Sequence, residues 1–364
     1  MLMNCFFGHF TRNWPLDFGG GASMASNELG EKHAQWISSV RENVLEPELP
    51  ILDPHHHLWL DEGHTGWPYT LDDFHQDTGS GHNVVGTVFL ECHAQYRQDG
   101  PEHLRSVGEV EFVADLAEQS AASDGAEIMA IQGNADVSMG AAVEEVLDAL
   151  EAAGRGRFRG VRYITAQDDH PPLAMYENAA MSDRLYLEGV RRVGELGYTY
   201  DAMVYHPQLS EVVGVAQACP DTPIVLDHLG GILGTGPYSD QRDEILDYWK
   251  KQMAAIAACN NVFLKLGGIG MPMMGFRWDK RDKPGTSAEL AEAWSDPIQY
   301  AIEVFGAERC MFESNFPVDK RGVGYVPLWN SFKLIASSCS TDEKRDLFYN
   351  TAARAYRLPL LEKS

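Results

Sequence analysis

Short apolar runs rich in β-branched residues recur along the chain, and the segments between them carry apolar residues at helical spacing. This alternation is typical of βα units. The predicted strands are Pro50–Asp53, Val84–Glu91, Glu127–Gly133, Phe158–Ile164, Thr199–Val204, Thr222–Asp227, Asn261–Leu266 and Arg309–Ser314. The predicted helices lie near Leu104–Ala121, Gly140–Ala153, Ser182–Leu196, Leu209–Cys219, Asp240–Cys259 and Ser287–Phe305. Eight strands alternating with helices favour an α/β fold, a closed (β/α)8 barrel of the TIM type, over an open doubly wound sheet.

Two further helices are predicted outside these units. Before the first strand, the segment from Asn27 to about Glu42 is polar with one apolar stripe, and we expect it to cover one end of the barrel. After the last strand, Ser340 precedes Glu343 by three residues in a capping box. The apolar residues that follow predict a helix that closes the outer ring.

The domain organisation follows from these elements. We expect an N-terminal extension over residues 1–48 with one helix, and a single distorted barrel over residues 49–364. Residues 1–23 lack the basic and apolar regions of a secretory signal, and Met24 resembles a second, more ordinary start. The first 23 residues are therefore left out of the fold prediction.

The chain of 364 residues is strongly acidic: 29 Lys and Arg stand against 53 Asp and Glu, giving a net charge of −24. Such a charge repels phosphate backbones and anionic membrane surfaces, so we expect no nucleic-acid or membrane partner. No apolar run reaches the ~18 residues that span a bilayer. The six cysteines show no CxxC spacing, which fits a cytoplasmic protein without a disulfide framework. A small-molecule partner is expected, and a homo-oligomer is left open.

The first predicted strand ends in three consecutive histidines, His55, His56 and His57. Successive side chains of an extended strand point to opposite faces, so His55 and His57 should share a face with Asp53, while His56 points the other way. Two imidazoles on one face can bind one divalent metal. From the triplet alone, a polar strand end with hydrogen-bonded rings is the simpler interpretation. The residues at the other strand ends are needed to decide between this interpretation and a metal site.

Polar side chains also gather at the ends of the other predicted strands. In a (β/α)8 barrel the loops after the strands form the active site. The residues at these positions are Glu91 and His93 at strand two, Arg162 at strand four, Asp201 to His206 at strand five, Asp227 and His228 at strand six, Lys265 at strand seven, and Glu313 to Asn315 at strand eight. Because a buried charge needs a partner or a function, these residues predict a catalytic centre at the barrel mouth.

From about Leu52 to Leu358 the sequence resembles the amidohydrolase superfamily, specifically the amidohydrolase-2 branch, which contains small-lactone hydrolases and, more distantly, non-oxidative decarboxylases. The motifs that carry the resemblance are Asp53-Pro54-His55-His56-His57-Leu58-Trp59, Gly160-Val161-Arg162-Tyr163, Val225-Leu226-Asp227-His228-Leu229-Gly230, Phe263-Leu264-Lys265-Leu266-Gly267-Gly268, Arg309-Cys310-Met311-Phe312-Glu313-Ser314-Asn315-Phe316-Pro317 and Asn350-Thr351-Ala352-Ala353-Arg354. Each motif by itself is weak evidence for the family, but their occurrence in this order along the chain makes the resemblance specific.

The resemblance implies a reaction centre in which water attacks a carbonyl held over His55, His57 and His228. The same three histidines are the metal ligands that it implies, for one divalent ion such as zinc or manganese; some lactonases of the branch work without a metal. Many members of the superfamily have a metal-bridging lysine or glutamate where this chain has Arg162, a permanent cation that cannot ligate. We therefore expect at most one metal.

At strand eight the usual metal-binding and proton-accepting aspartate of the superfamily is replaced by Asn315, whose amide cannot take a proton from water. Three interpretations stay open: Asn315 orients a water whose proton goes elsewhere, it orients the substrate, or the site is inactive. We favour the first. The candidate proton acceptors, by strand-end position, are Glu91, Asp319 and His206.

The remaining candidates are predicted substrate contacts: Arg162 for a substrate carboxylate, Lys265 for an anionic group or oxyanion, and His93 and His206 from their loops. The competing interpretation for Arg162 and Lys265 is that each pairs with a buried acid of the barrel.

The leading functional hypothesis is a hydrolase that opens a lactone or related cyclic ester of a small carboxylated metabolite, in the breakdown of a sugar acid or aromatic compound. The alternatives are a metal-dependent decarboxylase of a carboxylated ring, which Asn315 disfavours, and a non-catalytic protein that binds a small acid. Assays of lactones and aromatic acids with and without metal would separate them.

Overall fold

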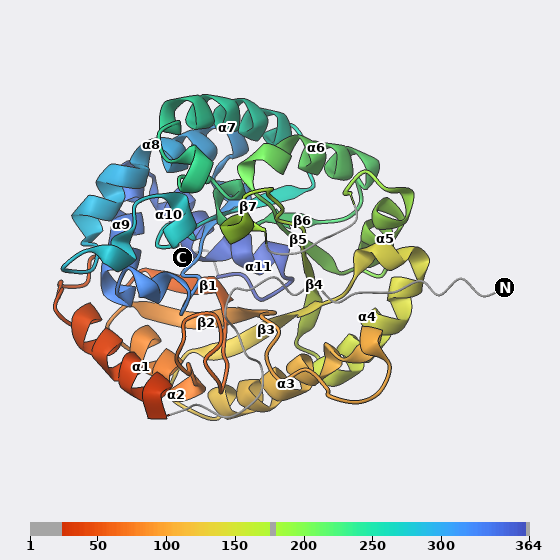
Figure 1. Ribbon diagram of the computed structural model, residues 1–364, viewed down its shortest axis with the longest axis horizontal. Helices are drawn as coiled ribbons and strands as arrows, with labels where there is room; N and C mark the ends of the chain where they lie inside the picture. Colours follow the sequence, from red (N-terminus) through yellow and green to blue (C-terminus); the bar gives the residue numbers. More distant parts are fainter. Residues whose placement is uncertain (1–23, 175–179, 362–364) are drawn as a thin grey trace.

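The structure is a computed structural model that describes residues 24–174 and 180–361. At its centre eight parallel strands follow one another in the order β1 to β8 (Figure 1). The strands are β1 Pro50–His56, β2 Asn83–Leu90, β3 Glu127–Asn134, β4 Phe158–Ile164, β5 Thr199–Met203, β6 Ile224–Leu226, β7 Val262–Leu266 and β8 Cys310–Phe312. β1 meets the chain after β8, because the His57 N–H donates to the Phe316 carbonyl at 2.8 Å. The predicted (β/α)8 barrel is confirmed.

Helices surround the barrel, and all six that were predicted between strands are present (Figure 1). They are α3 Val107–Ala121, α4 Val143–Gly154, α5 Arg184–Glu195, α6 Leu209–Ala218, α7 Arg242–Ala257 and α8 Ser287–Phe305. Two helices of the barrel were not predicted, α2 (Leu71–Thr78) and α9 (Tyr325–Ile335). α2 has only 8 residues. In α9, Pro327 resembles a helix break in the sequence, but it lies in the first turn, where proline is tolerated.

The C-terminal helical segment closes the bottom of the barrel. It comprises α10 (Thr341–Arg345), a π-helical turn (Asp346–Asn350) and α11 (Thr351–Ala355), and the predicted capping box of Ser340 and Glu343 is confirmed. The prediction that it closes the outer ring is wrong for α11, because the apolar side chains of this segment pack with inward-facing strand residues. These residues are Tyr349, Ala352, Ala353, Ala355 and Tyr356 with Leu52, Val88, Leu90, Ala130, Val225 and Met311. The barrel interior is therefore apolar at this end.

A β-bulge in β1 changes which residues face the barrel interior. The pairing of β1 with β2 shifts register between Asp53 and His56, so one extra residue is inserted there. Asp53 points out to the helix layer, where it accepts a hydrogen bond from the Tyr325 hydroxyl at 3.1 Å. The predicted common face of Asp53 with His55 and His57 is therefore wrong, because strict alternation does not hold across a bulge.

The N-terminal helix α1 (Met24–Ile37) lies against loops that follow three strands. Its His33 ring stacks on Trp67, after β1, and His33 Nε2 lies 2.7 Å from the Lys320 carbonyl, after β8. Its Trp36 donates to the Asp282 carbonyl, after β7, at 3.0 Å. The helix ends five residues before the predicted Glu42, because serine hydroxyls at 38 and 39 bond back to carbonyls three residues earlier and form a turn.

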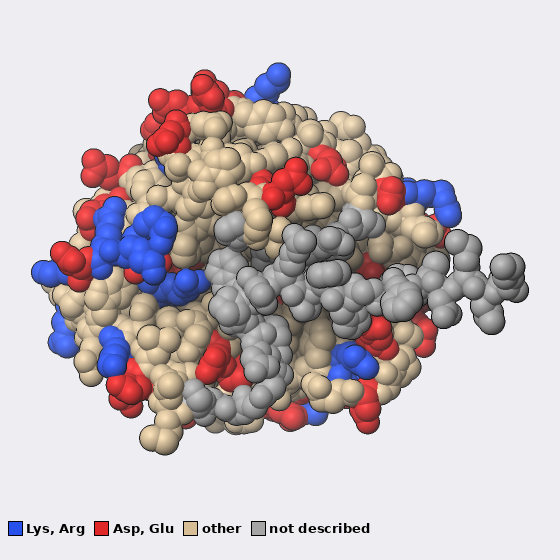
Figure 2. All heavy atoms as spheres, viewed as in Figure 1, with Lys and Arg blue, Asp and Glu red and all other residues tan. Residues whose placement is uncertain are grey.

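Acidic side chains are spread over the face shown in Figure 2, and a group of basic side chains lies at its left. Basic side chains are therefore grouped on part of this face although the net charge of the chain is −24. Among residues 24–174 and 180–361, no helix has the length and apolar character needed to cross a membrane. The five cysteines in these ranges are free.

Candidate active site

Three histidines converge at the carboxyl ends of the strands, as predicted. His55 comes from the end of β1, His57 follows it, and His228 follows β6. The rings of His55 and His228 have centroids 4.6 Å apart, and His55 Nε2 lies 3.1 Å from His57 Nε2. All three residues are at most 3% exposed. His56 is turned away, since its ring stacks on Phe74 with centroids 4.1 Å apart.

Glu313, directly after β8, joins two of these rings. Its Oε2 lies 2.6 Å from His55 Nδ1 and its Oε1 lies 2.7 Å from His228 Nδ1. Burial by itself lowers the pKa of His228, but the charge and hydrogen bond of Glu313 raise it above its ordinary value. His55 lies deeper, and burial together with the charge of Lys265 holds its pKa well below the ordinary range. Glu313 therefore orients both rings and favours the protonated form of His228.

The orientation of His57 is set by the backbone of the neighbouring strand. Its Nδ1 lies 2.9 Å from the Leu90 carbonyl, which can only accept, so Nδ1 carries the proton. The Nε2 lone pair then points toward His55. Burial and the charge of Arg162 hold the pKa of His57 well below its ordinary value. The ring is a neutral group at the base of the site.

Beneath the histidines, charges of alternating sign cross the barrel. Lys265 Nζ lies 2.8 Å from Asp201 Oδ2 and 2.9 Å from Asp227 Oδ1. Arg162 continues the series, 3.4 Å from Asp227 Oδ2 and 2.7 Å from Glu91 Oε1. All five residues are at most 3% exposed. The contacts thus support the interpretation that both cations pair with buried acids, and neither is left open for a substrate anion.

These cations also reach His55. Arg162 Nη1 lies 3.3 Å from His55 Nε2, and Lys265 Nζ lies 3.3 Å from His55 Nδ1. Positive charge on this side of His55 opposes a second metal ion there. Asp201, Asp227 and Glu313 were among the polar strand-end residues noted in the sequence, but none of them was assigned a role. They could have been predicted from the sequence as the acidic partners that the buried cations Arg162 and Lys265 require at neighbouring strand ends.

Asn315 is joined to a buried carboxylate. Its Nδ2 donates to Asp319 Oδ1 at 2.9 Å, and the Gly270 N–H donates to Asp319 Oδ2 at 2.9 Å. Burial raises the pKa of Asp319 to about 7. Both Asn315 and His228 have a left-handed backbone with φ of 53°. Such conformations in residues other than glycine are concentrated at functional sites.

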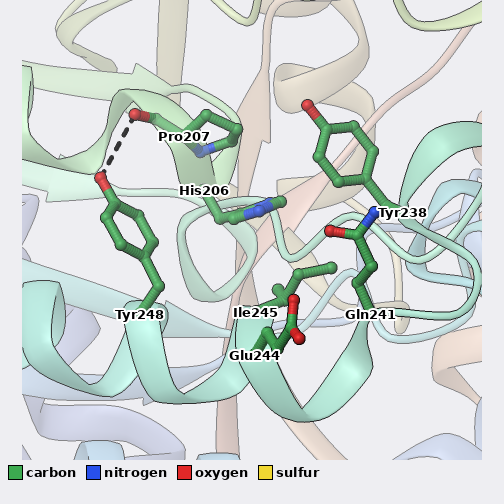
Figure 3. A pocket seen from close by; sticks show the side chains of 7 residues that line it. All are labelled: His206, Pro207, Tyr238, Gln241, Glu244, Ile245 and Tyr248. Carbon is green, nitrogen blue, oxygen red and sulfur yellow. Dashed lines mark hydrogen bonds between the residues drawn. The ribbon is translucent and has the colours of Figure 1, made fainter.

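The other predicted site residues lie apart from this centre or are already paired. Glu91 is held by Arg162, with its Oε2 3.5 Å from His93 Nε2. The side chain of His93 is 31% exposed and lies at the rim. His206 lines a separate cavity with Tyr238 and Tyr248 (Figure 3). Of the three candidate proton acceptors, Asp319 is the one that the structure links to Asn315.

One group of side chains has the arrangement of a metal site. Ligand atoms of His55, His228 and Glu313 lie within 4.8 Å of one another, and all three residues are buried. Two imidazoles and one carboxylate form a donor set that zinc uses in proteins. The group therefore fits one divalent ion, with Glu313 in the place where the sequence prediction had put His57.

Residues 52–358 match the family model described as Amidohydrolase. The chain is 28% identical over 331 residues to protein y4mH of Sinorhizobium fredii, covering 85% of this chain and 99% of that protein. It is 28% identical over 253 residues to an L-fucono-1,5-lactonase of Burkholderia multivorans, covering 69% of this chain and 77% of the lactonase. A crystal structure of a Burkholderia multivorans amidohydrolase with bound zinc has a TM-score of 0.66 and 23% identity, covering 85% of this chain and 99% of that one.

Proposed function

Because the chain belongs to the amidohydrolase family, we propose that it is a hydrolase that opens a lactone or related cyclic ester by attack of water at the barrel mouth. The observation that carries the proposal is the buried bridge from His55 through Glu313 to His228 at the carboxyl ends of the strands. The similarity to an L-fucono-1,5-lactonase supports a lactone as the substrate class. A substrate carboxylate is not part of the proposal, because Arg162 is paired with Glu91.

In this reaction His228 polarises the substrate carbonyl. Glu313 holds Nδ1 of His228, so Nε2 is the ring nitrogen that can donate a hydrogen bond to the carbonyl oxygen. The raised pKa of His228 favours the protonated ring, and a buried donor stabilises the oxyanion that forms when water attacks. The deeper ring of His55 keeps Glu313 in place.

Asn315 and Asp319 activate the water. Asn315 positions it, and Asp319, which accepts the amide hydrogen of Asn315, takes its proton. A carboxylate with a pKa of about 7 is matched to this task near neutral pH. The ring-opened product leaves as a hydroxy acid. When the ring C–O bond breaks, Asp319 gives its proton to the departing ring oxygen, and the acid proton of the new carboxyl group is released to solvent.

A divalent metal, if the reaction uses one, would be held by His55, His228 and Glu313. When bound there it would polarise the carbonyl as a Lewis acid. The zinc in the Burkholderia multivorans amidohydrolase supports zinc as the first ion to test.

The proposal is tested with purified protein assayed on a panel of sugar lactones, pyrone lactones and carboxylated aromatic rings, each after chelation and after addition of zinc or manganese. Hydrolysis of at least one lactone is expected, detected as release of one proton per turnover. Release of carbon dioxide from an aromatic acid, without lactone opening, would replace the proposal with decarboxylation. Binding without turnover of any compound would indicate a protein that has lost catalysis.

Replacement of Asn315 by alanine should lower kcat roughly 10- to 1000-fold, the range for losing one positioned polar contact. Asn315→Asp restores a carboxylate that can ligate metal, so its metal affinity should rise. Both variants are compared with the parent protein in metal-free and metal-loaded form. An alanine variant with unchanged kcat would place Asn315 outside the chemistry.

The pH dependence of kcat/KM should show a limb that rises through about pH 7. Asp319 must be ionised to accept a proton, and burial shifts its ionisation upward to that range, so protein at lower pH carries the inactive, protonated form. Asp319→Asn should remove the limb together with most of the activity. Asp282→Asn, an exposed position in the loop after β7, is the control and should keep the parent profile. A parent profile that is flat from pH 5 to 9 would rule out Asp319 as the base.

Metal analysis of protein equilibrated with excess zinc and then desalted should give no more than one ion per chain. The reason is that Arg162 and Lys265 bring two positive charges within 3.3 Å of the His55 ring nitrogens. A His228→Ala variant should bind less zinc than the parent. Two ions per chain in the parent protein would contradict the site as described.

A further inference from the structure

A cavity of about 290 Å³, widely open to solvent, lies beside the loop that follows β6 (Figure 3). Its walls come from three segments: the turn after β5 with His206, the turn of residues 236–238, and the start of α7. Among the residues that the structure describes, its lining side chains make no hydrogen bond or ion pair with the histidine cluster or Glu313. The cavity therefore has a lining of its own, which shares no side chain with the histidine cluster.

His206 offers a hydrogen-bond donor to this cavity. The residue is only 4% exposed, and the Leu233 N–H donates to its Nδ1 at 3.3 Å, so Nδ1 carries a lone pair. Burial lowers the pKa of His206 to about 4, so the ring is neutral and its proton is on Nε2. In the described ranges the hydrogen bond found at the ring is the one to Nδ1, and the nearby Gly231 carbonyl raises the pKa of the ring slightly against the effect of burial. Figure 3 shows the ring projecting between Tyr248 on one side and Tyr238 with Gln241 on the other.

The opposite wall offers acceptors. Gln241 and Glu244 lie at the first turn of α7, and both are exposed to solvent. Figure 3 shows their polar ends on the same side of the His206 ring as Ile245. The cavity thus presents a neutral N–H donor facing a carboxylate and an amide.

Two tyrosine rings complete the walls, and their hydroxyl groups are already engaged. The Tyr238 hydroxyl donates to Asp168 Oδ2 at 2.6 Å, and the Tyr248 hydroxyl donates to the Pro207 carbonyl at 3.4 Å. These bonds restrain the rings, while 36% of Tyr248 stays exposed. The rings therefore provide positioned apolar surface, and the hydroxyl groups are not free to recognise a ligand.

We propose that this cavity is a second binding site, for a neutral ring that bears several hydroxyl groups, such as a pyranose sugar. A hydroxyl group can accept from His206 Nε2–H and donate to Glu244 at the same time, which no purely donating or accepting group can do. An anion is disfavoured by Glu244, and a group that can only donate leaves the N–H of His206 without an acceptor. The apolar faces of the tyrosine rings suit the C–H face of a sugar. This proposal is independent of the lactone chemistry at the barrel mouth.

The test is a titration of isotope-labelled protein with methyl β-D-glucopyranoside and methyl α-L-fucopyranoside, followed by NMR of the histidine ring signals. At least one glycoside should shift the His206 ring signals saturably. Glu244→Gln, Tyr248→Ala and His206→Phe should each raise Kd about tenfold, equivalent to ~1.4 kcal/mol. Asp243→Asn is the matched control, because this neighbouring acid of α7 is exposed and does not line the cavity, and its Kd should equal that of the parent.

The position of the bound sugar is checked with Asn315→Ala, which alters the barrel mouth and should leave glycoside Kd unchanged. Loss of glycoside binding in that variant would place the sugar at the mouth and overturn the proposal. Absence of a saturable shift with both glycosides would also overturn it, as would binding of phenol with no binding of either glycoside. Because Glu244 and Tyr248 are exposed, their variants remain informative even if His206→Phe fails to fold.

Discussion

Glu313→Gln should lower kcat by roughly 100- to 1000-fold, in the range of removing a preorganised electrostatic group from a buried site. One oxygen of Glu313 accepts a hydrogen bond from His228 Nδ1, and the other lies 2.6 Å from His55 Nδ1. Glutamine removes the negative charge that faces both rings, so the protonated form of His228 loses the group that stabilises it. Steady-state kinetics with a lactone identified by the substrate panel provide the measurement.

A second readout separates this role from a loss of folding. Because the charge of Glu313 raises the pKa of His228, the neutral glutamine should lower that pKa, and NMR titration of the His228 ring detects the shift. Glu303→Gln, an exposed glutamate of α8, is the control and should change neither kcat nor the titration. If Glu313→Gln keeps the parent kcat and the parent pKa of His228, the bridge is not part of the site.

Lys265→Met should lower the free energy of unfolding by about 3–5 kcal/mol, the usual cost of leaving buried charges without a partner. Lys265 is fully buried between Asp201 and Asp227, and its removal leaves two carboxylates in the barrel with Arg162 as the remaining nearby cation. Denaturant unfolding followed by circular dichroism measures the change. Lys251→Met, an exposed lysine of α7, should stay within about 0.5 kcal/mol of the parent.

The pH dependence of this loss has a defined sign. Burial already raises the pKa of Asp201 to about 6, although Lys265 opposes the shift. Without Lys265 that pKa rises further, so the folded variant binds a proton that the unfolded chain releases, and its stability falls as pH rises from about 4 toward and beyond 6. The variant should therefore be closer to the parent at pH 5 than at pH 8. Combining Lys265→Met with Asp201→Asn should cost less than the sum of the two single changes. Additive losses would mean that the two side chains do not interact.

Much of the architecture could be predicted because its signals are local. Apolar runs and helical spacing are properties of short segments, and they located all eight strands and the six helices between β2 and β8. The same reasoning missed α2, which is too short to show a period, and α9, whose first turn contains Pro327. It also assigned α11 to the outer ring, since an apolar helix face does not indicate which apolar surface it will meet.

At the candidate site, the sequence by itself determined the three histidines, the inward direction of His55 and His57 against His56, and the presence of charged residues at the strand ends. Only the tertiary structure decided which of these charges meet. The bulge in β1 sends Asp53 to Tyr325, and barrel closure brings Glu313 between His55 and His228. Lys265 and Arg162 find partners on other strands, up to 71 residues away in sequence. The physical reason is that a buried charge is stabilised only by the partner that geometry places within about 4 Å, and strand alternation carries no information about that distance.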